Sequence, residues 1–139
     1  MEEAQELVSI KFDKVMQSRS YTVVILSAPG KKFAIYTEPS HGKMMQMYLT
    51  GITKSRPLIY ELLQKILRGF DIQVKQVVIS HLEDTTYFAR LFLEQKLDEM
   101  LHIVEIDARP SDCITLALLT HAPLFCTQEV LGKVVPVEE

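Results

Sequence analysis

Residues 72–93, IQVKQVVISHLEDTTYFARLFL, contain the pattern that decides the fold. The β-branched run Ile72–Ser80 predicts one strand, and Tyr87–Leu93 predicts a second strand with alternating faces. Residues 82–86 between them fit the loop of a β-hairpin. Strands joined by so short a loop are antiparallel, so this stretch favours an α+β fold over a doubly wound parallel sheet.

Three further strands are predicted on the N-terminal side of this hairpin. Their apolar runs cover residues 7–12, 21–26 and 32–37. The segment Ala28-Pro29-Gly30-Lys31 fits a turn between the last two, because Pro presets φ and Gly accepts positive φ. The strands at residues 21–26 and 32–37 are therefore predicted to form a second hairpin.

Two helices are predicted between the two groups of strands. A short one begins with Ser40 as its N-cap and is ended by Gly51. A longer one carries an apolar stripe from Ile59 to Phe70, with Pro57 suited to its first turn. The second is the clearest helix in the sequence.

The C-terminal third continues the alternation of strands and helices. We expect a charged loop over Glu94–Glu99, then a strand at 101–107, a helix at 110–120 and a strand at 124–127. The prediction is an α+β fold: a largely antiparallel sheet of hairpins with about three helices. Ser55-Arg56-Pro57 and Ala108-Arg109-Pro110 each open a predicted helix, which suggests two related strand-helix units.

Size and composition indicate one domain over residues 1–139, because 139 residues with 47% hydrophobic content can bury a core. The net charge of −3 means that a nucleic-acid partner would need a local basic surface. No apolar run is long enough to span a bilayer, so we expect a cytoplasmic protein without a membrane partner. Cys113 and Cys126 lie in apolar segments and are expected to be free buried thiols.

The segment Asp107-Ala108-Arg109-Pro110-Ser111-Asp112 lies where a predicted strand gives way to a helix. A Pro at the first helical position leaves neighbouring N–H groups available to an anion, and an arginine adds a planar fork that matches phosphate. Arg109, Ser111 and, by the same logic, Arg56 are therefore predicted to bind phosphate. The structural alternative is that Ser111 or Asp112 caps the helix and Arg109 pairs with Asp107 or Asp112.

Carboxylates supply the candidates for metal-assisted hydrolysis of a phosphodiester, in which Mg²⁺ or Mn²⁺ would neutralise charge and activate water. The candidates are Asp107, Asp112, Glu61 and Asp84. Their spacing matches no metal motif, so solvated or capping roles compete with ligation. The sequence contains no phosphate-binding or dinucleotide-binding glycine motif, and we expect no organic cofactor.

Several motifs together resemble the bifunctional nuclease domain family. They are Arg56-Pro57-Leu58, residues 84–91 (DTTYFARL), residues 106–112 (IDARPSD) and residues 122–125 (APLF). The resemblance spans nearly the whole chain and implies an α+β fold with a largely antiparallel sheet. It also implies cleavage of DNA and RNA, which is reported for some members.

The chain departs from the family pattern at two places. Relatives commonly have a glutamate where this chain has His41, and His-Asp where it has Tyr60-Glu61. If that glutamate and histidine belong to a metal site, the site is altered or lost here.

Three hypotheses follow from the sequence. The first is a nuclease in which Arg56 and Arg109 position phosphate and Asp107, Asp112 and Glu61 hold a divalent ion or activate water. The second is a non-catalytic domain that binds an anion or a partner protein and has lost the active site. The third makes the Arg-Pro-Ser-Asp segment purely structural.

Exposed hairpin edges also make a homodimer an expectation, because self-pairing covers such edges.

Overall fold

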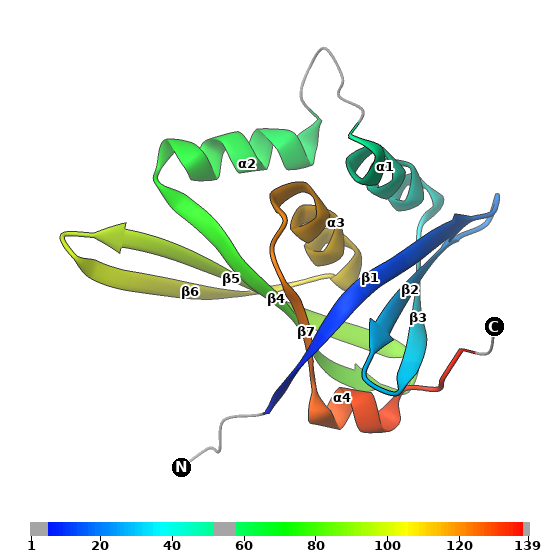
Figure 1. The fold of residues 1–139 in the computed structure, drawn as a ribbon. Coiled ribbons are helices and arrows are strands. Elements are labelled where there is room, and N and C mark those ends of the chain that lie inside the picture. The colour runs from blue at the N-terminus through cyan, green and yellow to red at the C-terminus, as the bar shows by residue number, and fades with distance from the viewer. Residues whose placement is uncertain (1–5, 52–57, 138–139) are drawn as a thin grey trace.

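The computed structural model describes residues 6–51 and 58–137, which form one mixed sheet with four helices around it (Figure 1). The strands are β1 (Leu7–Gln17), β2 (Thr22–Ala28), β3 (Lys31–Thr37), β4 (Ile72–Glu83), β5 (Thr86–Leu97), β6 (Met100–Ala108) and β7 (Leu124–Thr127). The helices are α1 (Pro39–Thr50), α2 (Ile59–Gly69), α3 (Pro110–Thr120) and α4 (Gln128–Lys133). This confirms the predicted α+β class.

The sheet has the strand order β3-β2-β1-β7-β4-β5-β6 and consists of two antiparallel meanders on either side of β7. β7 is antiparallel to β1 and parallel to β4. Each meander feeds directly into a helix, β3 into α1 and β6 into α3. The helices that follow the two meanders are thus α1 and α3, whereas the sequence-based prediction paired α2 with α3; α2 follows α1 in the element order, not a strand. Of the two segments on which this prediction rested, residues 55–57 lie outside the described ranges and residues 108–110 lie inside them.

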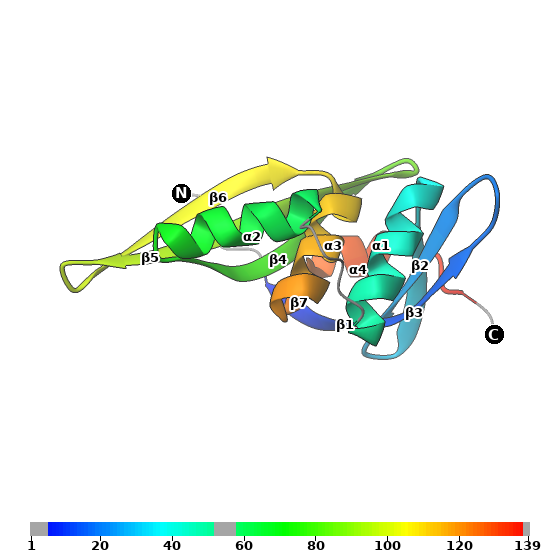
Figure 2. The ribbon, with the colours of Figure 1, turned by 90° about the horizontal axis from the view of Figure 1, so that it is seen from above.

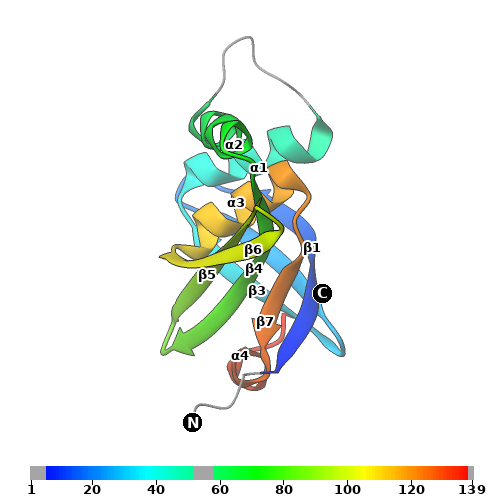
Figure 3. The same ribbon diagram turned by 90° about the vertical axis from the view of Figure 1, so that its left-hand side faces the viewer.

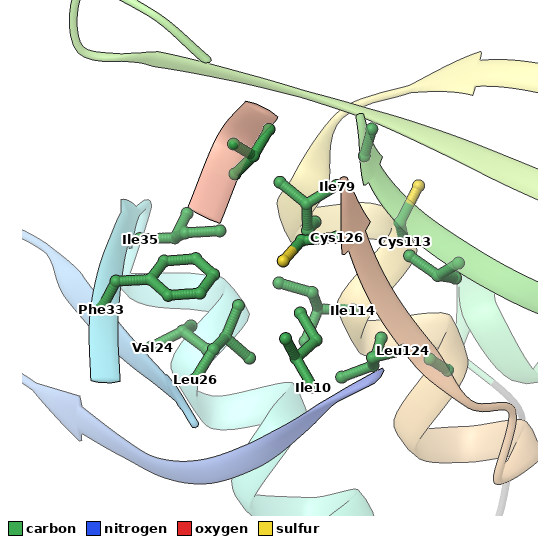
Figure 4. Packing of buried hydrophobic residues seen from close by; sticks show 14 of the residues in the cluster. Ile10, Val24, Leu26, Phe33, Ile35, Ile79, Cys113, Ile114, Leu124 and Cys126 are labelled. Atoms are coloured by element: carbon green, nitrogen blue, oxygen red, sulfur yellow. The ribbon is translucent and has the colours of Figure 1, made fainter. Parts of the chain in front are cut away.

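The core lies where the curved sheet meets α3 (Figure 4). Side chains from β2 and β3, such as Leu26 and Phe33, share one buried cluster with Ile79 of β4 and Cys126 of β7. α3 contributes Ile114 at its centre. α1, α2 and α3 lie together over one side of the sheet, whereas α4 lies at the opposite end (Figure 3). This arrangement brings the starts of α1 and α3 close to each other.

The structure corrects the predicted loop over Glu94–Glu99, because β5 continues to Leu97. Only Asp98 and Glu99 form the turn, both with positive φ (51° and 64°), which closes a two-residue hairpin between Leu97 and Met100. The charges that suggested a loop instead mark a solvent-exposed pair of strands.

Helix boundaries differ from the prediction at two further points. α1 begins at Pro39 with Glu38 as its N-cap, so the assignment of Ser40 as N-cap is wrong. α4 was not predicted, because its six residues are too few for a periodic pattern. Its start is fixed by the Thr127 hydroxyl, which accepts a hydrogen bond from Val130 N. Pro57, expected in the first turn of α2, lies outside the described residues.

Both cysteines are free and buried, as expected. Burial raises the pKa of the Cys113 thiol to about 12, so this thiol stays protonated at neutral pH.

None of the helices within residues 6–51 and 58–137 is long and apolar enough to cross a membrane.

Two glycines offer a matched test of the packing of α1. A Cβ on Gly42 would lie 2.6 Å from the hydroxyl oxygen of Thr22, which is fully buried and donates to the Pro39 carbonyl. We expect Gly42→Ala to lower the free energy of unfolding by about 1–3 kcal/mol through overpacking, although alanine is the better helix former. A Cβ on Gly69 at the end of α2 meets no atom within 4 Å. Gly69→Ala should therefore raise the free energy of unfolding by about 0.5 kcal/mol. Denaturant unfolding measures both, and the same sign of effect in the two variants would contradict the tight contact at Gly42.

Candidate functional site

The N-termini of α1 and α3 meet and place four polar side chains together. Glu38 and Arg109 are the N-cap residues, both with extended backbone, and a proline follows each. Arg109 Nη1 lies 3.4 Å from Glu38 Oε1. Three residues further on, His41 Nε2 lies 3.5 Å from Asp112 Oδ1. We call these four residues and Tyr60 of α2 the helix-start cluster.

Asp112 is the centre of the helix-start cluster. Its carboxylate accepts a hydrogen bond from Tyr60 OH at 2.5 Å and one from Arg109 Nε at 2.9 Å, with Arg109 Nη2 at 3.4 Å. Burial alone raises the pKa of Asp112. The hydrogen bonds from Arg109 and Tyr60 and the charges of Arg109 and His41 lower this pKa, and together they outweigh the effect of burial. The net effect is a pKa below the ordinary value, so Asp112 is held ionised.

Tyr60 connects α2 to this centre. It is the buried residue of α2, and its hydroxyl points to the Asp112 carboxylate. Burial raises the pKa of Tyr60, and its hydrogen bond to Asp112 and the charge of that carboxylate raise it further, while Arg109 opposes them. The phenol therefore remains a hydrogen-bond donor.

His41 is buried between two protein partners. Its Nδ1 lies 2.8 Å from the Thr37 hydroxyl, and its Nε2 faces Asp112. Both ring nitrogens therefore face protein atoms.

The other predicted site residues take separate positions. Glu61 Oε2 accepts a hydrogen bond from Leu58 N at 2.7 Å, which is a capping contact at the start of α2. Asp107 lies opposite Arg90 in the register of β6 with β5. Ser111 is buried, and its carbonyl accepts a bond from Thr115. Arg56 lies outside the described residues and stays a sequence-based prediction.

The residues of the cluster do not fit a divalent metal ion as arranged. Within the described ranges, no three side chains of His, Cys, Asp or Glu gather where they could hold a metal. Both oxygens of Asp112 accept hydrogen bonds from protein donors, and one oxygen of Glu61 caps a helix. His41 and Tyr60, the two residues noted in the sequence as differing from the expected family pattern, both face Asp112, as does Arg109.

A cavity of about 610 Å³ opens beside the cluster, between β3, the turn from β4 to β5 and the start of α3. Tyr36 on its wall is 67% exposed and is contacted edge-on by Tyr21, with ring centroids 5.6 Å apart. The lining residues are Ser20, Ile35, Tyr36, Thr37, Glu38, Pro39, Thr85, Thr86, Tyr87, Arg109, Pro110 and Ser111. Arg109 therefore belongs both to the cluster and to the wall of the cavity.

Sequence reasoning identified Arg109 and Asp112 but missed Glu38 and Thr37. A signal for Glu38 was present, because residues 38–41 (EPSH) match residues 109–112 (RPSD) at Pro and Ser. The two tetrapeptides place the residues that contact each other, Glu38 with Arg109 and His41 with Asp112, at equivalent helix positions.

Comparisons with known proteins place this site in a family. The family model described as the Bifunctional nuclease domain matches residues 23–138, which include the whole helix-start cluster. The uncharacterized protein Rv1829 of Mycobacterium tuberculosis is 25% identical over 122 residues, which are 86% of this chain and 70% of that protein. Bifunctional nuclease 1 of Arabidopsis thaliana is 27% identical over 81 residues, which are 58% of this chain and 25% of the plant protein.

The bond between Tyr60 and Asp112 can be tested by a double-mutant cycle. We expect Tyr60→Phe to lower the free energy of unfolding by about 1 kcal/mol, because a hydrogen bond to a charged acceptor is lost. Tyr48→Phe is the control, since its hydroxyl contacts only the weak acceptor Met44 Sδ at 3.8 Å. In an Asp112→Ala background the effect of Tyr60→Phe should largely disappear. An unchanged effect there would mean that Tyr60 stabilises the fold by packing alone.

The lowered pKa of Asp112 predicts a pH dependence of stability. Its folded pKa lies below the ordinary value of 3.8, so ionised Asp112 contributes stability above that pH and the contribution is lost as the pH falls through the folded pKa. Asp112→Asn lacks this contribution. The difference in unfolding free energy between wild type and variant should therefore be largest at neutral pH and shrink below about pH 4. Denaturant titrations at several pH values measure it, and a difference that stays constant with pH would show that folding does not lower the pKa of Asp112.

Proposed function

The chain belongs to the bifunctional nuclease domain family, and from that premise we propose that it binds nucleotide units of single-stranded nucleic acid beside Arg109 without metal-dependent cleavage. The observation that supports the proposal is the difference between Asp112 and Arg109 in the helix-start cluster. Asp112 is engaged by protein donors, whereas the Arg109 side chain is 58% exposed and lines the adjacent cavity. The cluster therefore supports anion binding better than it supports hydrolysis.

Arg109 would hold the phosphate. Asp112 fixes its guanidinium through Nε at 2.9 Å, which orients the fork, while Nη1 makes only a 3.4 Å contact with the exposed Glu38. An exposed ion pair of this kind contributes about 0–1 kcal/mol, so a phosphate can displace Glu38. The adjacent start of α3 adds its positive dipole end.

Tyr36 would hold the base. Its ring is exposed on the cavity wall, and the edge-on contact from Tyr21 limits its motion. Stacking of a base on such a ring contributes about 1–3 kcal/mol and is tolerant of sequence. Thr85 and Thr86 line the same cavity, and a threonine hydroxyl can hydrogen-bond to a sugar or phosphate oxygen.

The overall charge limits the binding to a local contact. With a net charge of −3, the chain repels extended polyanions, so we expect short single strands to bind through about one phosphate. The affinity should then fall with salt with a slope of roughly −0.7 in a double logarithmic plot.

Phosphodiester cleavage is the second candidate function. It is favoured by the name of the plant relative, Bifunctional nuclease 1, of which this chain matches 25%. In this chain it would use Mg²⁺ or Mn²⁺ held by Asp107, Asp112 and Glu61. The described contacts of Asp112 and Glu61 do not fit that role, so cleavage would need a rearrangement of the helix starts.

Fluorescence anisotropy with a labelled single-stranded RNA or DNA of about ten nucleotides tests the proposal, since single folds cover about 4–16 nucleotides. We expect Arg109→Ala and Tyr36→Ala each to weaken binding at least about tenfold, which is a loss of about 1.4 kcal/mol. Arg90→Ala is the control, because Arg90 is a partly exposed arginine that pairs with Glu105 and is not among the residues that line the cavity.

The same samples separate the competing functions. If wild type does not bind, or Arg90→Ala weakens binding as much as Arg109→Ala, the proposed site is wrong. If Arg109→Ala lowers the melting temperature but leaves binding unchanged, its role is only structural. Cleavage that requires added Mg²⁺ or Mn²⁺ and disappears in Asp112→Ala would establish the second candidate instead.

A further inference from the structure

Large apolar side chains are concentrated on one exposed part of the molecule, formed by α2 and the hairpin of β5 and β6. We call it the α2–β6 surface. It consists of Ile59, Leu62, Leu63, Ile66, Phe70, Leu97, Met100, Val104 and Ile106, all of which are exposed. α2 and the hairpin project together beyond the rest of the sheet (Figure 2). Residues of this kind are normally buried in a core or in an interface.

α2 turns its apolar stripe away from the core. Ile59, Leu62, Leu63 and Ile66 follow helical spacing, yet Tyr60 is the buried residue of this helix. An amphipathic helix usually faces its apolar stripe to the protein interior. The stripe of α2 therefore lacks a covering element within the described residues.

The hairpin turns apolar side chains toward the same side of the sheet. Val104 pairs with Leu93, and Ile106 pairs with Leu91, which is buried on the face that α3 covers. Paired residues in neighbouring strands point to the same face. The acidic residues Glu105 and Asp107 alternate with them and point to the other face, where Glu105 meets Arg90. The helix side of β6 therefore carries Met100, Val104 and Ile106 together with His102, and no acidic side chain.

β6 is also an edge strand whose protecting charges, Glu105 and Asp107, lie on one face only. It ends the strand order, runs for nine residues without proline or lysine, and pairs with β5 without a bulge. The opposite edge is protected, because β3 begins with Lys31 and Lys32 and the Lys32 carbonyl accepts a hydrogen bond from Val137 N. Natural proteins rarely leave a long apolar edge open to solvent.

We propose that the α2–β6 surface binds a second copy of this chain. A two-fold axis beside β6 would pair β6 with the same strand of the partner and place the two α2 helices side by side over the joined sheet. One symmetric contact then covers both the open edge and the apolar stripe, as an isologous interface does. Another kind of partner would have to present an edge strand and an apolar helix face together.

The exposed apolar area of the α2–β6 surface is large enough for a dimer interface. Nine side chains of this kind, each about half exposed, present on the order of 800 Å², which is close to what each partner buries in a stable interface. Since β6 leads directly into Arg109, a dimer would also fix the strand that positions this arginine.

Sedimentation velocity of the full chain over about 1–100 µM tests the proposal, because interfaces of this size bind in the micromolar range or tighter. We expect wild type to sediment as a dimer. Ile66→Glu and Val104→Lys should each weaken dimerisation at least tenfold. Leu49→Glu on α1 is the control, because Leu49 is exposed to the same extent as Ile66, 47% against 49%, and lies outside the surface. Circular dichroism checks that each variant stays folded.

The proposal is overturned if wild type remains a monomer over this range. It is also overturned if Leu49→Glu disrupts the dimer as strongly as Ile66→Glu, or if neither Ile66→Glu nor Val104→Lys disrupts it. Val104→Lys keeps the test decisive where Ile66→Glu fails to fold, and none of these variants alters the cavity beside Arg109.

Discussion

The ion pair between Arg109 and Asp112 is the interaction on which the site depends. It joins the last residue before α3 to the first turn of that helix, and through Glu38 and His41 it joins α3 to α1. Tyr60 adds α2 to the same carboxylate. Three helices that cover one side of the sheet therefore meet at one ionised group, and any change in the charge of Asp112 affects all three contacts.

The order of strands and helices could be predicted from local patterns. The helix Pro110–Thr120 and the strand Leu124–Thr127 were predicted with the bounds that the structure has, because a proline and short apolar runs mark them. The end of β5 was predicted wrongly. Its charged residues lie on an exposed hairpin, and charge in a sequence reports exposure to solvent and not the absence of a strand.

The helix-start cluster could be predicted only in part. Arg109 and Asp112 are close in sequence, and their local motif drew attention to them. Glu38 is 71 residues from Arg109 in sequence, so their contact depends on the sheet order that brings two meanders together. The departures from the family pattern at His41 and Tyr60 were visible in the sequence. Their convergence on Asp112 was not, because it depends on how α1 and α2 pack against α3.

The most direct test of this account is a titration with Mn²⁺, with free ion measured by electron paramagnetic resonance, on wild type and on the double variant His41→Glu with Tyr60→His. The double variant places a carboxylate and an imidazole beside Asp112. The account predicts that wild type binds no Mn²⁺ through Asp112 and that the double variant gains a site that Asp112→Ala removes. Binding of Mn²⁺ by wild type that is lost in Asp112→Ala would contradict it.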